Sequence, residues 1–311
     1  MLKIIFMGTP DFAVSTLENL LAWPGGQVVA VVTAPDRPAG RGRQLQASAV
    51  KVAAAAHGLP VLQPTNLKSP DFQAELKGYA ADLQVVVAFR MLPETVWNMP
   101  RLGSINIHAS LLPQYRGAAP INWALMHGDV ETGVTSFFLR HEIDTGDLIF
   151  QDRVAIAPED DFGSLYDKLK AVGATLARRS VEAIAAGTAP SIPQVQQANL
   201  RPAPKLSKET GRLDFSRPAT ELVNWVRGLS PIPTAFAPLP DGRILKIFRA
   251  QVVPPDAATE PLATPGTWAS DGRNYLRMAA TDVWLDVLDV QLEGKKRMSV
   301  AELLRGFKLP A

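Results

Sequence analysis

Three polar side chains of this sequence have the chemistry needed to move an acyl group onto an amine. Asn106 and His108 lie two residues apart in the apolar run Ser104-Ile-Asn-Ile-His, and Asp144 follows in Ile-Asp-Thr-Gly-Asp. An amide stabilises an oxyanion, an imidazole exchanges protons near neutral pH, and a carboxylate orients an imidazole. The sequence has no cysteine, which excludes cysteine nucleophiles, disulfides and thiolate metal sites. We therefore predict Asn106, His108 and Asp144 as a catalytic set that uses no metal.

The elements around these residues predict a mostly parallel sheet with flanking helices. A strand at Ser104–His108 would place Asn106 and His108 on one face of the sheet, because side chains alternate along a strand. Similar apolar runs occur at residues 3–7, 28–33 and 83–88. Helical spacing occurs between and after them, at residues 11–21, 48–56, 70–79, 93–98 and 120–127. This alternation is typical of a Rossmann-like α/β domain, whose ligands bind at the carboxyl edge of the sheet.

The rest of the chain predicts an extension of this sheet and a second, smaller domain. Residues 134–139 and 148–155 read as an antiparallel extension, and residues 161–186 as a long closing helix. Several prolines without periodicity then predict a linker at residues 188–206. After a helix at 219–229, short strands and two Asp-Gly turns predict an OB-like β-barrel; the strands are at 234–237, 245–253, 275–279 and 283–290. The expected domains are therefore 1–187 and 207–311.

Charge is distributed unevenly between these two parts. The whole chain carries a net charge of +2, but from Arg201 onward it has 16 Lys and Arg against 12 Asp and Glu. This basic excess suggests an anionic partner for the C-terminal part, although a solvated basic face explains the charge equally well.

Composition points to a soluble globular protein, with 47% hydrophobic and 20% charged residues. The first apolar run is too short for a signal peptide, and no segment has the roughly 20 apolar residues of a membrane span. Together with the lack of cysteine, these features predict a cytoplasmic protein, and no exposed apolar seam is evident, which fits a monomer.

Three motif interpretations fail. The turn Gly8-Thr9-Pro10-Asp11 lacks the G-x-G-x-x-G pattern of a dinucleotide site. The stretch from Arg37 to Arg43 lacks the Gly-Lys-Ser/Thr ending of a phosphate-binding loop. The single Asp-Thr-Gly cannot form the paired carboxylates of an aspartic protease.

Longer segments around the catalytic set carry a family resemblance. Ser-Ile-Asn-Ile-His-Ala-Ser-Leu-Leu-Pro-Gln-Tyr-Arg-Gly-Ala-Ala-Pro-Ile spans residues 104–121, and Glu-Thr-Gly-Val-Thr and Ile-Asp-Thr-Gly-Asp follow between residues 131 and 147. With these segments the chain resembles the folate-dependent formyltransferases. Gly-Thr-Pro-Asp-Phe at 8–12 and Lys-Leu-Ser-Lys-Glu-Thr-Gly-Arg-Leu-Asp-Phe at 205–215 make it most similar to the members that formylate an aminoacyl-tRNA.

The resemblance implies a donor, an acceptor and a folate site. The donor would be 10-formyltetrahydrofolate, and the acceptor would be the α-amino group of methionyl initiator tRNA, with Asn106, His108 and Asp144 as the catalytic residues. The pterin would be held largely by backbone after the fourth strand and near residue 140. The implied folate-binding residues are Phe89, Arg90, Met91, Leu92, Ser110, Leu111, Leu112, Pro113, Leu139 and Ile143. Arg90 stands where many family members have glycine.

The resemblance also implies a surface for tRNA. By composition, residues 37–43 read equally well as a flexible solvated loop, whereas the family makes them an insertion loop that folds against the acceptor stem, with Arg41 as its main contact. Two more basic clusters follow, at 201–217 and 295–297, and each alone would more often be a solvated face. The predicted tRNA-binding residues are Arg37, Arg41, Arg43, Lys205, Lys208, Arg212, Lys295, Lys296 and Arg297.

Two alternatives remain open from the sequence. Formyl transfer to an amino sugar nucleotide would use the same Asn-x-His and Asp set on a similar sheet. A non-catalytic RNA-binding protein would require all three polar residues to be ordinary core residues.

Overall fold

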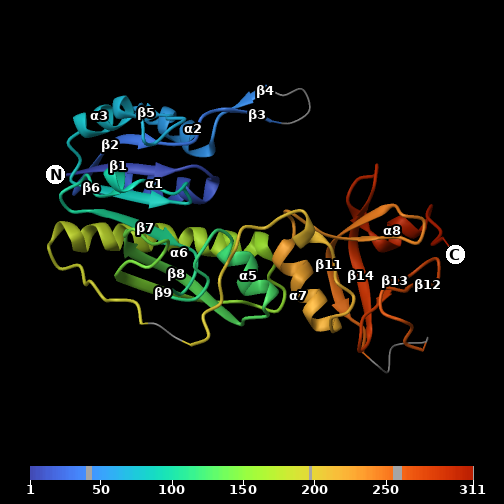
Figure 1. Ribbon diagram of the computed structural model, residues 1–311. Helices are drawn as coiled ribbons and strands as arrows, with labels where there is room; N and C mark the ends of the chain where they lie inside the picture. The colour runs from blue at the N-terminus through green and yellow to red at the C-terminus, as the bar shows by residue number, and fades with distance from the viewer. Residues whose placement is uncertain (40–43, 196–197, 255–260, 311) are drawn as a thin grey trace. The chain divides into compact units, whose positions relative to one another are not determined.

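The computed structural model of the chain forms two compact units that interleave along the sequence (Figure 1). One unit comprises Met1–Gly117, Thr132–Ala155 and Tyr166–Pro202, and the other comprises Ala118–Glu131, Ile156–Leu165 and Ala203–Ala311. The structure describes residues 1–39, 44–195, 198–254 and 261–310. The domain limits expected from the sequence, with a linker at 188–206, stay a prediction.

A seven-stranded sheet organises the first unit, in the order β5-β2-β1-β6-β7-β8-β9. Its strands are β1 (Leu2–Gly8), β2 (Gly26–Val32), β5 (Val61–Leu62), β6 (Leu83–Val87), β7 (Ser104–His108), β8 (Glu131–Phe138) and β9 (Leu148–Ala155). The pairs from β5 to β7 are parallel, whereas β8 runs antiparallel to β7. This arrangement confirms the Rossmann-like fold. From β1 the chain adds strands first in one direction, β2 and β5, and then in the other, from β6 onward. Ligands of such sheets bind at the carboxyl ends of the strands where the order changes direction.

Helices cover both faces of this sheet. They are α1 (Asp11–Leu21), α2 (Ala49–Ala56), α3 (Pro70–Gly78), α4 (Glu94–Trp97) and the long α6 (Phe162–Ala185). On one face, Phe72 of α3 and Val96 of α4 pack in a single apolar cluster with Val86 of β6. On the other face, a Cβ atom on Gly173 of α6 would lie 3.5 Å from Ile107. Ile107 therefore points toward α6, and its neighbours Asn106 and His108 point to the opposite face.

A short hairpin replaces part of the loop that the sequence predicted at residues 37–43. Strand β3 (Arg37–Ala39) pairs antiparallel with β4 (Gln44–Gln46). Residues 37–39 are therefore a paired strand, which three residues without a periodic pattern could not indicate, and the insertion loop implied by the family resemblance stays a prediction. Arg41 and Arg43 lie outside the described residues.

An antiparallel sheet organises the second unit, in the order β10-β11-β14-β13-β12, with β15 added to β14. Its strands are β10 (Ala235–Pro238), β11 (Ile244–Val252), β12 (Trp268–Ser270), β13 (Leu276–Ala279), β14 (Trp284–Leu292) and β15 (Met298–Ser299). The pairing of β11 with β14 shifts register twice, near Arg249, and such bulges bend a strand. The curled sheet confirms the OB-like fold expected from the sequence.

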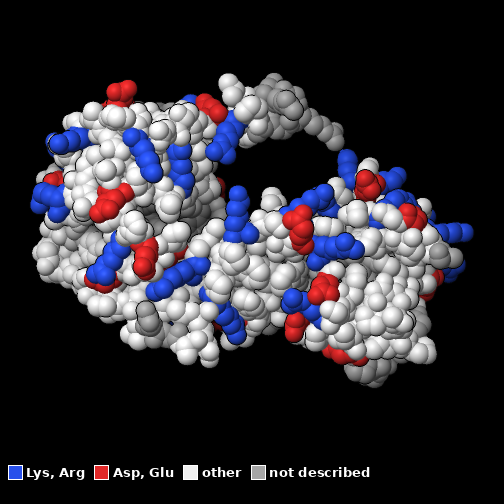
Figure 2. Space-filling model, viewed as in Figure 1, with Lys and Arg blue, Asp and Glu red and all other residues white. Residues whose placement is uncertain are grey.

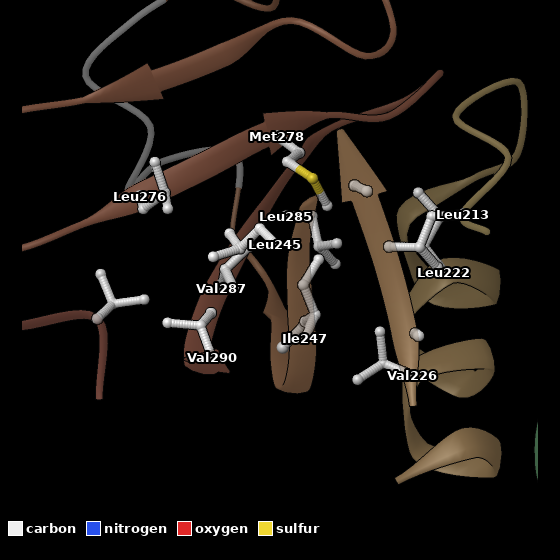
Figure 3. Close-up of a cluster of buried hydrophobic side chains, with 14 of the residues drawn as sticks. Leu213, Leu222, Val226, Leu245, Ile247, Leu276, Met278, Leu285, Val287 and Val290 are labelled. Atoms are coloured by element: carbon white, nitrogen blue, oxygen red, sulfur yellow. The ribbon is translucent and has the colours of Figure 1, made fainter. Parts of the chain in front are cut away.

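Four short helices accompany this sheet: α5 (Pro120–Met126), a 3₁₀ turn (Glu209–Gly211), α7 (Ala219–Leu229) and α8 (Val300–Leu304). The sequence did not predict β12, β15 or α8, since they span only two to five residues. Figure 3 shows Leu222 and Val226 of α7 facing the side chains of the sheet, among them Ile247 of β11. The amphipathic α7 thus closes the apolar core of the second unit.

No helix in the described part of the chain combines the length and the apolar character that crossing a membrane requires.

Truncating this core should weaken folding of the second unit. Ile247 is fully buried, so we expect Ile247→Ala to lower the free energy of unfolding by about 2–5 kcal/mol through lost burial and a residual cavity. Chemical denaturation measures the loss. Arg249→Ala, an exposed position on the same strand, is the control and should change stability by less than about 0.5 kcal/mol. Equal effects of the two variants would contradict the packing described above.

The connection from β8 to β9 depends on a glycine. A Cβ atom on Gly146 would lie 1.6 Å from the carbonyl oxygen of Phe138, a backbone atom that can move only with its strand. We expect Gly146→Ala to destabilise the protein by about 1–3 kcal/mol or more, as overpacking does, which thermal unfolding would detect. Gly78→Ala at the end of α3, where a Cβ meets nothing within 4 Å, should leave the unfolding temperature at or above that of the wild type.

Candidate active site

The register of β7 places Asn106 and His108 between two strands at the carboxyl edge of the sheet. Asn106 pairs with Val86 of β6 and with Phe137 of β8, and His108 pairs with Thr135. Asn106 is partly exposed, and its side chain has no hydrogen-bond partner among the described residues. Its amide is therefore available to a ligand that enters at this edge.

A backbone carbonyl holds the imidazole of His108. The ring is 7% exposed, and its Nε2 donates a hydrogen bond of 2.8 Å to the carbonyl oxygen of Tyr115. Because a carbonyl only accepts, this bond requires the proton on Nε2, so in the neutral ring the lone pair is on Nδ1. Nδ1 lies 3.8 Å from Oδ2 of Asp144, too far for a direct hydrogen bond. The carbonyl of Tyr115 thus selects the tautomer and orients the ring, whereas the sequence led us to expect a carboxylate, Asp144, to orient it.

Asp144 is held in place from the opposite loop. Its Oδ2 accepts a hydrogen bond of 2.9 Å from the backbone N–H of Gly117, and the residue is only 8% exposed. Asp144 and Tyr115 both adopt left-handed backbone conformations, with φ of 54° and 59°. Such conformations are unfavourable for residues other than glycine, and they cluster at sites of function. The two loops therefore face each other across the imidazole in a strained and specific arrangement.

Thr135 ties the segment after β7 to β8. Its Oγ1 donates to the carbonyl of Ser110 at 2.6 Å and accepts from the N–H of Leu112 at 3.1 Å. Nε2 of Gln151 donates to the carbonyl of Leu112 at 2.8 Å. The sequence did not single out Thr135 or Gln151, because a polar residue on a strand, whether buried like Thr135 or exposed like Gln151, gives no signal of what it bonds.

The predicted folate residues divide into a buried group and an exposed group. Phe89, Leu92 and Leu139 pack against the apolar cluster that contains Val86, which is the face of the sheet that bears Asn106. Ser110 and Leu112 are buried after β7, and Leu111 and Pro113 are partly buried. Met91 and Ile143 are 74% and 61% exposed. The described structure therefore gathers most of these residues near the ends of β6, β7 and β8.

Arg90 has a defined place in this region. Its guanidinium donates to the backbone carbonyls of Thr65, at 3.0 Å, and of Pro64, and it lies 5.7 Å from the ring centroid of Phe89. Burial lowers the pKa of Arg90, and the nearby charge of Arg37 lowers it further. Arginine at this position thus serves to link the loop after β6 to residues 64–65.

The predicted tRNA-binding residues of the second unit are all exposed: Lys205, Lys208, Arg212, Lys295, Lys296 and Arg297. Arg297 is paired with Asp289, which raises its pKa, and it stacks over Phe248. Figure 2 shows Lys and Arg on the visible face of this unit with Asp and Glu between them. This face therefore carries separate cationic positions rather than a uniform basic patch.

A cavity of about 830 Å³ in the second unit includes one residue of a predicted basic cluster and borders another cluster. Lys208 lines it from the segment before the 3₁₀ turn, and Glu293 and Gly294, which precede the cluster at 295–297, line another wall. Lys246 of β11 and Phe236 of β10 also line it. Sequence reasoning missed Lys246, although the exposed positions of an alternating strand could have indicated it.

No group of three or more His, Asp or Glu side chains that could hold a metal ion occurs among the described residues.

Sequence models of the two formyl transferase domains match the chain: "Formyl transferase" at residues 2–181 and "Formyl transferase, C-terminal domain" at residues 205–308. A curated relative from Bacteroides fragilis, named methionyl-tRNA formyltransferase, is 52% identical over 99% of this chain and 96% of its own length. A relative of the same name from Flavobacterium johnsoniae is 45% identical over 98% of this chain and 96% of its own length.

Solved structures show the same fold at much lower identity. A sugar 3N-formyl transferase, solved with dTDP and 5-N-formyl-THF, has a TM-score of 0.66 and 18% identity, covering 95% of this chain and 99% of its own. HypX from Aquifex aeolicus, solved with tetrahydrofolic acid, has a TM-score of 0.59 and 19% identity, covering 97% of this chain and 46% of its own. The full-length relatives and both domain matches show that the chain is an enzyme of the formyl transferase family and belongs with the methionyl-tRNA formyltransferases.

Proposed function

We propose that this protein transfers the formyl group of 10-formyltetrahydrofolate to the α-amino group of methionyl initiator tRNA. The observation that carries the proposal is the full-length similarity, 52% identity over 99% of the chain, to a protein named for this reaction. A fold alone would not suffice, since one fold hosts many functions.

A folate donor is supported by the neighbours solved with 5-N-formyl-THF and with tetrahydrofolic acid. In this chain the donor would lie against the loops after β6 and β7. Phe89, Leu92 and Leu139 offer it an apolar wall, and the partly exposed Asn106 lies on the same face of the sheet.

The reaction forms one bond and breaks another at the formyl carbon. The lone pair of the methionyl amine attacks this carbon, and the carbonyl oxygen takes up the negative charge. The side-chain N–H of Asn106 donates to that oxyanion, which stabilises the transition state. The bond to N10 of the folate then breaks, so N10 must gain a proton and the former amine must lose one.

His108 is arranged to handle that proton. With Nε2–H bonded to the carbonyl of Tyr115, the free lone pair at Nδ1 accepts a proton from the attacking amine, and the same proton is then available to N10. A ring protonated at both nitrogens faces two acceptors, the carbonyl of Tyr115 and the carboxylate of Asp144 at 3.8 Å. Asp144 therefore stabilises the charged intermediate form of the ring.

The acceptor is large and polyanionic, which fits the exposed cations of the second unit. Lys208 and Lys246 line one cavity together with Phe236, a combination that suits phosphate and base contacts. Lys205, Arg212, Lys295 and Lys296 are further exposed cations of this unit. Arg37 of β3, with Arg41 and Arg43 outside the described residues, would add contacts from the first unit.

Transfer to an amino sugar nucleotide is the alternative. It is less supported because the sugar formyl transferase shares only 18% identity with this chain. An assay that supplies 10-formyltetrahydrofolate with either methionyl initiator tRNA or a dTDP amino sugar separates the two. Formylation of the tRNA supports the proposal, and formylation of the sugar alone overturns it.

Removing any one of Asn106, His108 and Asp144 should abolish most of the activity without unfolding the protein. For Asn106→Ala we expect kcat to fall about 100–1000-fold, the usual effect of losing one oxyanion donor, and His108→Ala and Asp144→Ala should lose most activity as well. Single-turnover formylation and circular dichroism measure these effects. His57→Ala, which removes an exposed histidine paired with Glu18, is the control. Near-wild-type turnover in any one variant would remove that residue from the catalytic set.

Removing the two lysines of the cavity should weaken tRNA binding rather than chemistry. For the double variant Lys208→Ala, Lys246→Ala, we expect lower affinity for initiator tRNA and a salt dependence smaller by about one unit of slope per lost phosphate contact. At saturating tRNA, kcat should be unchanged. Two exposed lysines of the first unit, Lys68 and Lys77, replaced together by alanine, provide the control of equal charge. An unchanged salt slope would exclude the cavity from the tRNA surface.

A further inference from the structure

A glutamine in the stretch between the two matched domains contacts the loop of Asp144. The domain matches end at residue 181 and resume at 205, and the sequence predicted a linker here. Nε2 of Gln194 donates to the carbonyl oxygens of Asp144, at 2.9 Å, and of Gly146, at 2.8 Å. Both donor hydrogens of this amide are therefore used to fix the backbone at Asp144.

The other end of the same amide contacts the opposite loop. Oε1 of Gln194 accepts from Nε of Arg116 at 3.2 Å and from Nη2 at 2.6 Å. Arg116 lies between Tyr115, whose carbonyl holds His108, and Gly117, whose N–H binds Asp144. One side chain thus bridges the two loops that face the imidazole.

The neighbouring residues of this stretch reinforce the attachment. Ile192 exchanges two backbone hydrogen bonds with Leu148, of 2.8 and 3.0 Å, and Oγ of Ser191 donates to Asp147 at 2.8 Å. The two backbone bonds of Ile192 hold this stretch against the first unit whether or not Ser191 makes its contact, so Gln194 is presented to the loops by a fixed backbone.

The hydrogen bonds of Gln194 support two unfavourable backbone conformations of the site. Tyr115 and Asp144 both have left-handed backbones, which persist only where surrounding contacts determine them. Gln194 donates to the carbonyl of Asp144 itself and accepts from Arg116, the residue beside Tyr115. Without them, the carboxylate and the carbonyl that face His108 lose a common support.

We propose that Gln194 is a positioning residue, which holds Asp144 and the Tyr115–Gly117 backbone in the arrangement that His108 requires. The stretch between the two matched domains is then part of the catalytic unit. The kinetic consequence rests on the proposed function, whereas the effect on the imidazole does not.

Replacing the amide should reduce kcat selectively. We expect Gln194→Met to lower kcat for formylation about 100-fold, because a displacement of about 1 Å at reacting groups has this effect. KM for tRNA and for 10-formyltetrahydrofolate should change little, as should the unfolding temperature. Ser191→Ala is the matched control, since it removes a hydrogen bond between the same stretch and the same loop but contacts Asp147 instead; its kcat should stay near the wild-type value.

Gln194→Glu separates the two ends of the bridge. It keeps an acceptor for Arg116, but it replaces the amide donor with a carboxylate oxygen that repels the carbonyl oxygens of Asp144 and Gly146. Its kcat should therefore be no higher than that of Gln194→Met. Wild-type kcat in Gln194→Glu, or a loss in Gln194→Met no larger than in Ser191→Ala, would overturn the inference.

Nitrogen NMR of the imidazole tests the same inference without substrate. The chain has four histidines, so His108 can be assigned by comparison with His108→Ala. Gln194→Met should shift the His108 ring nitrogens, and Ser191→Ala should not. If the wild-type protein formylates no tRNA, the proposed function fails while a His108 shift still supports the bridge. An unshifted His108 signal in Gln194→Met overturns the bridge whatever the activity.

Discussion

The arrangement of the candidate site depends on the hydrogen bond from Nε2 of His108 to the carbonyl of Tyr115. This bond fixes the tautomer of the neutral ring, whose Nδ1 lies 3.8 Å from Oδ2 of Asp144. A backbone acceptor can do this only if the chain at Tyr115 turns back over the end of β7, which requires its left-handed conformation. The backbone at Asp144, on the facing loop, has a left-handed conformation as well. The other polar contacts of the site, from Thr135 to Gln194, serve to hold these two loops.

Burial explains why so many of these contacts are needed. A polar group removed from water is costly unless it is hydrogen-bonded, and an incompletely bonded network is worse than an apolar core. Thr135 is fully buried and bonds both Ser110 and Leu112. Thr135 lies opposite His108 in the sheet. It therefore links β7, which carries the ring, to the segment after β7. The network therefore transmits the rigidity of the sheet to the loops, and Asn106 is left facing outward for a ligand.

In the proposed function the second unit has a different task, which is to bind a polyanion without a pocket shaped to its sequence. Its core is a conventional one, with α7 packed on a curled antiparallel sheet. Its exposed cations are interspersed with acidic residues, and pairs such as Arg297 with Asp289 fix some of them in place. Lys208 and Lys246 instead line a cavity with an aromatic side chain. Separate cations of this kind favour contact at defined phosphates over indiscriminate attraction.

The sequence by itself determined the elements whose signals are local. The spacing in Ser104-Ile-Asn-Ile-His put Asn106 and His108 on one face, since alternation is a property of the strand alone, and the parallel sheet and the α7 helix followed from periodicity. The two-residue strands β5 and β15 were too short to alternate, and the five-residue helix α8 was too short to show a helical period. The tertiary structure alone decided which groups touch the imidazole. The carbonyl of Tyr115 is a backbone group that every residue possesses, so no residue type in the sequence could indicate that it bonds His108. Gln194 reaches Asp144 across 50 positions of sequence, and only the folded chain brings the two together.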